Sequence, residues 1–217
     1  MKTLNDAILL RNRVIDMLEQ AENETDPILR KGLLNFVVVG GGYAGIETAG
    51  ELLDLLLDAR KHYPTIQKND VKVIVLEAMG EILSGANKKL ANFAKEELRK
   101  RGMDIQLKKA VTSFNGNEVM IKSLDETPKD SIDQSEISSI ITKTLIWTAG
   151  ITSVSTIKRS MFKTDKGKIV VDKFLEIKEF PGVFAIGDCA LFVDPITNRP
   201  FPPTAQIAEA QAKLAAK

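Results

Sequence analysis

Three glycines carry the clearest chemical signal in this sequence. Gly40, Gly42 and Gly45 are spaced as G-x-G-x-x-G directly after the apolar residues 36–39. In this pattern the first glycine permits a tight turn, the second lets the backbone approach a pyrophosphate, and the third lets the next helix pack closely on the strand. Free N–H groups at the N-terminus of that helix attract the phosphates. The stretch predicts a dinucleotide site, and the alternative is an ordinary glycine-rich turn between a strand and a helix.

An acidic residue, Glu77, stands near the end of the next apolar segment, residues 71–78. A carboxylate at the carboxyl end of the second strand can accept hydrogen bonds from the ribose hydroxyls of a bound nucleotide. Glu77 comes later than the roughly 20 residues that are usual after the glycines, and a polar insertion over residues 60–70 accounts for the excess. Because a carboxylate repels a 2′-phosphate, Glu77 predicts NADH rather than NADPH.

A second glycine–acid pair, Gly187 and Asp188, follows the apolar residues 183–186. An aspartate presented at the end of a strand can bind the hydroxyl groups of a polyol, because its ionised oxygens only accept hydrogen bonds. The alternative is a tight turn in which the aspartate caps a helix, which is common for such a pair on its own.

Glu47 lies two residues after the last glycine of the first motif. It can be a functional carboxylate or a partner of the helix dipole, and the latter is worth only a few tenths to about 1 kcal/mol. The only histidine, His62, sits in the polar insertion, so a histidine-based metal site or a Ser–His catalytic site has little support. With Cys189 as the only cysteine, no disulfide can form within the chain.

Apolar spacing and turn residues predict the elements that position these groups. Helices are expected over residues 4–20, from Pro27 to near Gly32, over 44–60, over 87–102 and from Thr204 onward. Strands are expected over 36–39, 71–78, 103–114, 118–124 and 141–147, and within 167–177 and 181–188, with a polar loop over 125–136. In the fourth helix the expected buried face consists of Leu90, Phe93, Ala94 and Leu98. Strands that alternate with helices predict an α/β fold with a parallel, doubly wound sheet.

The composition is that of an ordinary globular chain. Of 217 residues, 44% are hydrophobic and 27% are charged, and the formal net charge is +1. This balance offers no electrostatic argument for a nucleic-acid partner. The sequence contains neither a long apolar stretch of the kind that crosses a bilayer nor the apolar core of a signal peptide near its start. We therefore expect this segment to be soluble.

Taken together, the motifs resemble the two-dinucleotide flavoprotein oxidoreductases, and most closely the type II NADH dehydrogenases (NADH:quinone oxidoreductases). The resemblance runs through almost the whole chain, in the stretches "LRNRVIDMLEQAENETDP", "FVVVGGGYAGIETAGEL", "LIWTAGI", "FPGVFAIGDCA" and "PPTAQIAEAQ". It implies a Rossmann-like NADH-binding domain over residues 34–151, with a parallel sheet, helices and a β-meander. This domain would be flanked by pieces of a second, FAD-binding α/β domain: a helical segment or linker over 1–33 and an incomplete part over 152–217.

The resemblance also implies roles for single residues. The pyrophosphate of NADH would lie on Gly40, Gly42, Tyr43, Ala44 and Gly45, and Glu77 would hold its adenosine ribose. The stretch Thr148–Ala149–Gly150 would close the nucleotide pocket beside the nicotinamide and the flavin. Glu47 matches a family glutamate near that junction, where a buried carboxylate could orient the nicotinamide carboxamide or assist protonation of the quinone.

For the flavin and the quinone, the resemblance implies a second group of residues. Asp188, after Gly187, would bind the ribityl chain of FAD, and Ala205 and Gln206 would lie near the flavin ring where quinone docks. The family often has a further glutamine at position 210. This chain has Ala210 there with Gln211 beside it, which leaves the quinone contact of the second glutamine in doubt.

The family carries two features that this sequence lacks, namely a first FAD-binding glycine motif and membrane-attaching amphipathic elements at the end. The chain is therefore expected to be a central fragment that binds NADH weakly and FAD poorly or not at all, and that is inactive by itself. In the whole protein we expect a peripheral enzyme on the inner, cytoplasmic face of the cell membrane, with NADH and quinone as substrates and a homodimer as one option. The alternatives left open are a disulfide or sulfide:quinone reductase of the same fold and a non-enzymatic NADH-binding module.

Overall fold

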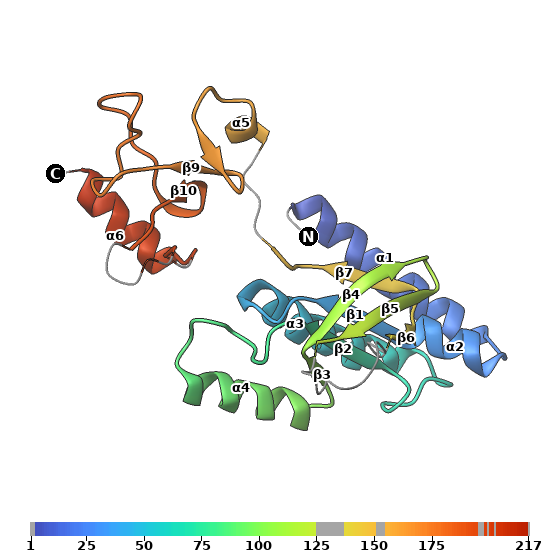
Figure 1. Cartoon of the computed structure of the whole chain (residues 1–217). Coiled ribbons are helices and arrows are strands. Elements are labelled where there is room, and N and C mark those ends of the chain that lie inside the picture. Colours follow the sequence, from blue (N-terminus) through green and yellow to red (C-terminus); the bar gives the residue numbers. More distant parts are fainter. Residues whose placement is uncertain are drawn as a thin grey trace, which may run out of the picture. The chain divides into compact units, whose positions relative to one another are not determined.

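The computed structural model describes residues 3–124, 137–150, 155–194, 198, 200–201 and 203–216. The chain divides into two compact units, Met1–Ala149 and Gly150–Lys217 (Figure 1). The first 33 residues belong to the first unit. The boundaries of the two compact units do not show which cofactor each unit binds. The assignment of residues 34–151 to NADH and of the flanking segments to FAD therefore stays a prediction.

The first unit is built on a four-stranded parallel sheet. Its order is β3 (Asp104–Leu107), β2 (Lys72–Glu77), β1 (Asn35–Val39) and β7 (Thr144–Trp147). Every residue of β1 is buried, as expected of a central strand covered on both faces. The register places the end of β1 opposite the ends of its two neighbours. The three strands therefore deliver their following loops to one edge of the sheet, where ligands bind in open α/β folds.

Helices of the first unit cover one face of this sheet. They are α1 (Leu4–Asn23), α2 (Pro27–Leu34), α3 (Tyr43–Ala59) and α4 (Lys88–Lys100), with a short 3₁₀ turn over Arg60–His62. Thr3 and Asp6 form a reciprocal capping box at the start of α1, which satisfies two otherwise free N–H groups. Asp26 caps α2 with Pro27 at its first position, as the sequence predicts.

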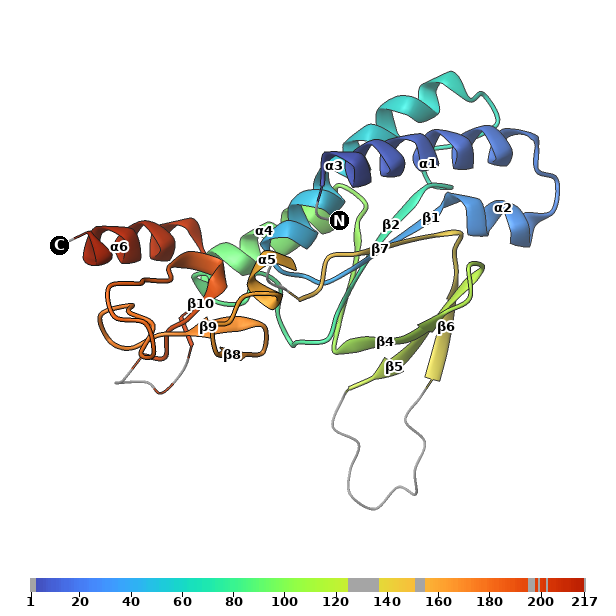
Figure 2. The ribbon, with the colours of Figure 1, turned by 90° about the horizontal axis from the view of Figure 1, so that it is seen from above.

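A three-stranded antiparallel meander covers the other face (Figure 2). It consists of β4 (Lys109–Phe114), β5 (Glu118–Ser123) and β6 (Ile137–Ile141). Alternate residues of β1 face the two layers: Phe36 and Val38 pack with the helices, whereas Val37 and Val39 pack with the meander. This period of two fixes the register of the central strand, because a slip by one residue would exchange the two faces.

One strand predicted in this unit was wrong, and the end of one helix differs by two residues. The single strand expected over residues 103–114 is divided at Lys108, whose φ of 53° turns the chain from the parallel sheet into the meander. Gly32 does not end α2 but lies within it. A Cβ at that position would lie 3.0 Å from a methyl carbon of Ile141, so the glycine allows β6 to approach the helix.

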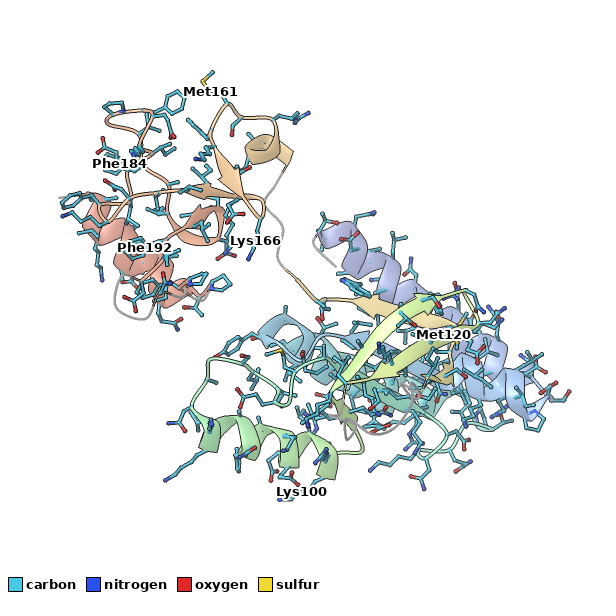
Figure 3. The ribbon with its side chains drawn as sticks, in the orientation of Figure 1. Lys100, Met120, Met161, Lys166, Phe184 and Phe192 are labelled. Atoms are coloured by element: carbon cyan, nitrogen blue, oxygen red, sulfur yellow. The ribbon has the colours of Figure 1, made fainter. Side chains whose placement is uncertain are left out.

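The apolar face predicted for α4 was right for Leu98 and wrong for Leu90 and Phe93. Leu98 is buried together with Ala91, whereas Leu90 and Phe93 are 65% and 66% exposed. The physical reason is the position of α4 beside β3, a strand at the edge of the sheet. A helix at an edge buries only a narrow stripe, and the rest of its apolar pattern faces outward. Figure 3 shows Lys100 at the end of this helix.

The described part of the second unit contains a small three-stranded sheet and two helices. The strands are β8 (Thr164–Asp165), β9 (Lys168–Val170) and β10 (Ala190–Leu191), and the helices are α5 (Ser155–Lys158) and α6 (Ala205–Ala215). A 3₁₀ turn, η2, spans Gly187–Cys189. Among the described residues, one buried apolar cluster consists of Ile169, Ile177, Ala185 and Ala190.

The strand predicted over residues 183–186 is absent from this described segment. Only an isolated bridge joins Phe184, labelled in Figure 3, to Glu176. The Asp172 carboxylate accepts the N–H groups of Phe174 and Glu176 and so turns the chain just after β9. Side-chain hydrogen bonds of this kind compete with a strand ladder, which limits the predicted strand within 167–177 to Lys168–Val170.

Within the described part of the chain, no helix combines the length and the apolarity that a bilayer-spanning segment requires.

Candidate dinucleotide site

The glycine turn joins the end of β1 to the start of α3. Gly40 has a φ of 111°, a backbone conformation that residues with a side chain rarely adopt. In addition, a Cβ on Gly40 would lie 3.0 Å from the backbone nitrogen of Ala149. A Cβ on Gly45 would lie only 1.9 Å from the carbonyl oxygen of Gly40. Gly42 differs, because nothing lies within 4 Å of a Cβ built there. The turn is therefore closed on its inner side and open at the one glycine that would face a pyrophosphate.

The N-terminus of α3 offers hydrogen-bond donors beside this opening. Gly42 is the N-cap and provides no side chain to satisfy the first turn. The first N–H groups of a helix lack intrahelical partners and carry partial positive charge. Tyr43 and Ala44, which follow, are exposed. The arrangement is suited to a phosphate group at this end of the helix.

Glu77 ends β2 and binds the glycine turn directly. One carboxylate oxygen accepts the N–H of Gly41 at 2.5 Å, and the other accepts the N–H of Met79 at 2.7 Å. A Cβ on Gly41 would lie 3.0 Å from the Cβ of Glu77, so position 41 also favours a glycine. Each oxygen keeps lone-pair capacity for a further donor. The carboxylate can therefore hold the turn and still accept hydrogen bonds from ribose hydroxyls.

Two contacts to neighbouring strands fix the turn from the other side. The N–H of Gly40 donates to the carbonyl of Leu76 at 2.9 Å, which ties the turn to β2. The Thr148 hydroxyl donates to the carbonyl of Val39 at 2.7 Å, which ties it to the end of β7. Ala149 packs against the apolar cluster under the meander. The first unit thus brings together the turn Gly40–Gly45, Glu77 and Ala149. The next residue, Gly150, has a φ of 78° and begins the second unit.

Glu47 is exposed on α3 rather than buried, which corrects the environment expected for it. Its position in the first turns places it on the outer side of the helix, while Ile46 and Ala49 take the buried side. It lines a groove of about 300 Å³ between α1 and α3, with Leu10, Glu51 and five others. Its carboxylate has no hydrogen bond or ion pair with any described residue.

The second glycine–acid pair lies in the second unit. Gly187 has a φ of 67° and begins η2, and the Asp188 carboxylate that follows is exposed. Ala205 and Gln206, also exposed, form the first turn of α6, which packs against η2. Asp188 and this helix start therefore belong to one small cluster.

Gln211, which the sequence placed beside Ala210 without a role, is a functional candidate in the structure. Its side-chain oxygen accepts the N–H of Gly187 at 2.7 Å, and the residue is only 9% exposed. The family pattern "AQ" pointed to Gln206. The hydrogen bond between Gln211 and Gly187 joins residues 24 positions apart, so no local sequence pattern could have predicted it. Gly41 was missed for the same reason, because its constraint comes from Glu77.

Comparison with known proteins identifies the family. Residues 7–212 match the sequence profile of the family described as "Pyridine nucleotide-disulphide oxidoreductase". The chain belongs to this family. The matched region contains both glycine–acid pairs, and the α/β fold with a parallel sheet that the sequence predicts is confirmed.

Within the family, type II enzymes are prominent among the relatives. A "Probable NADH dehydrogenase" of Dictyostelium discoideum is 34% identical over 220 residues, which cover 100% of this chain and 45% of that protein. "Type II NADH:quinone oxidoreductase Ndh" of Mycobacterium tuberculosis is 34% identical over 200 residues, covering 88% and 40%. The predicted resemblance is confirmed. The chain spans less than half the length of these relatives.

Solved structures agree on the fold. The structure of NDH2 from Plasmodium falciparum in complex with NADH matches with a TM-score of 0.75 at 22% sequence identity, over 88% of this chain and 38% of that one. A putidaredoxin reductase bound to putidaredoxin matches with a TM-score of 0.61 at 20% identity. Neither comparison tests the roles assigned to single residues, which stay predictions.

Proposed function

We propose that this chain supplies the NADH-binding part, and a portion of the FAD-binding part, of an NADH:quinone oxidoreductase. The observation that carries the proposal is the turn at the end of β1, closed by contacts at Gly40 and Gly45 and open at Gly42. The Glu77 carboxylate stands beside it. Relatives named NADH dehydrogenase and type II NADH:quinone oxidoreductase support the reaction class.

The geometry of the first unit supports our proposal of NADH binding. The pyrophosphate would approach the backbone at Gly42 and the free N–H groups of Tyr43 and Ala44, where no side chain intervenes. Glu77 would accept the adenosine ribose hydroxyls while its bonds to Gly41 and Met79 keep it in place. A charged acceptor held by two donors disfavours a 2′-phosphate, and this is our basis for proposing NADH over NADPH.

In our proposal, residues of the second unit contact the flavin and the quinone. Asp188 is exposed and sits after a glycine with positive φ, which suits a carboxylate that binds ribityl hydroxyls. FAD, when bound, would supply the hydride acceptor and pass electrons onward, which is chemistry that protein side chains lack. Ala205 and Gln206 would border the flavin ring where a quinone docks, as the family resemblance implies.

Glu47 would act at the junction of nicotinamide and flavin. Its carboxylate has no partner among the described residues and is therefore available to orient a carboxamide or to transfer a proton to a quinone. The whole enzyme would work peripherally at the inner face of the cell membrane, where quinone is found, and as a homodimer if its subunits pair. These parts of the proposal rest on the resemblance and on the relatives' names.

One titration tests the central claim. NADH and NADPH are titrated against the chain by the fluorescence of the reduced nicotinamide. We expect saturable NADH binding that is tighter than NADPH binding. Equal affinity for the two nucleotides would refute the assignment of Glu77, and a chain that binds neither nucleotide would refute the proposed dinucleotide site.

A further inference from the structure

The buried amide of Gln211 has a specific structural partner in the second unit. Its side-chain oxygen accepts the N–H of Gly187 at 2.7 Å, while the adjacent position 210 is an exposed alanine. Gln206, one and a half turns earlier on α6, is exposed. The two glutamines therefore differ in environment, and Gln211 does not take the place of a second solvent-facing glutamine.

A second contact shows that α6 is fitted to this turn. A Cβ built on Gly187 would lie 3.4 Å from the Cβ of Ala208. Ala208 and Gln211 are three residues apart, so they lie on one face of the helix. On this face, the small side chain of Ala208 allows α6 to approach η2 closely. The amide oxygen of Gln211 accepts the N–H of Gly187, the first residue of η2.

The turn at Gly187–Cys189, which Gln211 contacts, has a backbone conformation that needs support from other residues. Gly187 has a φ of 67°, and η2 is a single 3₁₀ turn with no side-chain cap of its own. Gly187 also has the largest conformational freedom to lose on folding, as glycine does generally. Removing the acceptor would leave a part-buried N–H without a partner and would free the turn.

We infer that Gln211 is a positioning residue, which holds the Gly187–Cys189 turn so that the Asp188 carboxylate is presented to the ribityl hydroxyls of a flavin. This inference rests on the proposed function for the identity of the ligand. Gln211 itself is only 9% exposed. Its effect passes through one hydrogen bond to the backbone.

The test combines hydrogen exchange with flavin binding in the full 217-residue chain. Gln211→Leu keeps the approximate volume and removes the acceptor, whereas Gln211→Glu keeps an acceptor oxygen. Lys213→Gln, an exposed change on the same helix, is the control. Amide exchange of Gly187 is followed by NMR, and FAD affinity is measured by quenching of flavin fluorescence.

We expect exchange of the Gly187 amide to be slow in the wild type and at least about tenfold faster in Gln211→Leu, as for loss of one buried hydrogen bond. FAD affinity should fall by about the same factor. Gln211→Glu should restore slow exchange and recover affinity above that of Gln211→Leu. Lys213→Gln should match the wild type in both measurements.

Three results would overturn the inference. Fast exchange of Gly187 in the wild type would show that the hydrogen bond is not made, and this result needs no variant to fold. Unchanged exchange in folded Gln211→Leu would show that the amide does not hold the turn. Faster exchange with unchanged FAD affinity would show that the flavin does not depend on it. A wild-type chain that binds no FAD would agree with an incomplete FAD site and would not bear on the proposed NADH site, and the exchange data would still decide whether Gln211 holds the turn.

Discussion

The two glycine–acid turns of this protein are held in different ways. The turn at Gly40–Gly45 is tied to β2 and β7 by backbone and hydroxyl hydrogen bonds and is closed by the charged carboxylate of Glu77. The turn at Gly187 has no side-chain cap of its own and receives one neutral amide, from Gln211. The first turn is held by the parallel sheet, because β1, β2 and β7 end at the same edge and place their contacts around it. The second depends on a single helix face, so we expect it to be the easier of the two to disturb without unfolding the protein.

The largest effect is expected from a methyl group at Gly45. In Gly45→Ala the new Cβ would lie 1.9 Å from the Gly40 carbonyl oxygen, so backbone must move. We expect the free energy of unfolding in urea to fall by about 3 kcal/mol or more. Gly50→Ala on the same helix is the matched control, since nothing lies within 4 Å of its Cβ. That variant should gain about 0.5–1 kcal/mol from helix propensity, and equal losses in both would contradict the close packing at Gly45.

The next effect concerns nucleotide binding. Glu77→Ala removes the acceptor for Gly41, for Met79 and, in our proposal, for the ribose. NADH binding should weaken by about 1–3 kcal/mol, and discrimination against NADPH should shrink because the repelling charge is gone. Glu179→Ala, which removes an exposed carboxylate in the second unit, serves as the control. Unchanged affinity in Glu77→Ala, measured by nicotinamide fluorescence, would remove Glu77 from the site.

A change at Gly187 compares the two turns directly. Gly187→Ala places a side chain at a φ of 67°, which costs roughly 1–2 kcal/mol, but its nearest neighbour is 3.4 Å away. Gly40→Ala has an unfavourable φ and also three atoms within about 3.1 Å. Urea unfolding should therefore show a smaller loss for Gly187→Ala than for Gly40→Ala. The reverse order would mean that the second turn is the more constrained.

Glu47 should affect rate rather than binding. In a preparation with FAD and quinone turnover, Glu47→Gln should lower kcat more than it weakens NADH binding, because the carboxylate would act when electrons and protons move. Glu51→Gln is the control, since Glu51 is also exposed and lines the same groove. Equal losses of kcat and affinity would make Glu47 a ground-state binding residue.

The smallest effect is a pH dependence of stability in the first unit. Burial, and then the negative charges of Glu19 and Glu22, raise the pKa of Tyr63 above its ordinary value of 10.0. The folded state therefore holds the phenol proton more tightly than the unfolded state. The resulting stability is present below pH 10 and is lost as the pH rises through the folded pKa. Urea unfolding at several pH values above 9 should show this decline in the wild type and a weaker one in Tyr63→Phe.

Sequence patterns predicted the main elements of the first unit well. The apolar run at β1, the glycine spacing and the proline after Asp26 are local signals, and each acts within a few residues. The patterns failed where a distant element decides the outcome. Phe93 is exposed because α4 lies beside an edge strand, and the strand predicted within 167–177 is short because the Asp172 carboxylate turns the chain after β9.

By itself, the sequence determined that a strand, a glycine turn and a helix follow one another, that an acid ends the next strand, and that the chain resembles a flavoprotein family. These features depend on backbone conformation and residue type, which neighbours in the sequence control. Only the tertiary structure decided that Glu77 closes the turn at Gly41 and that Gln211, rather than Gln206, holds Gly187. Both contacts join residues 24 or more positions apart, and their geometry exists only once the sheet or the helix has packed.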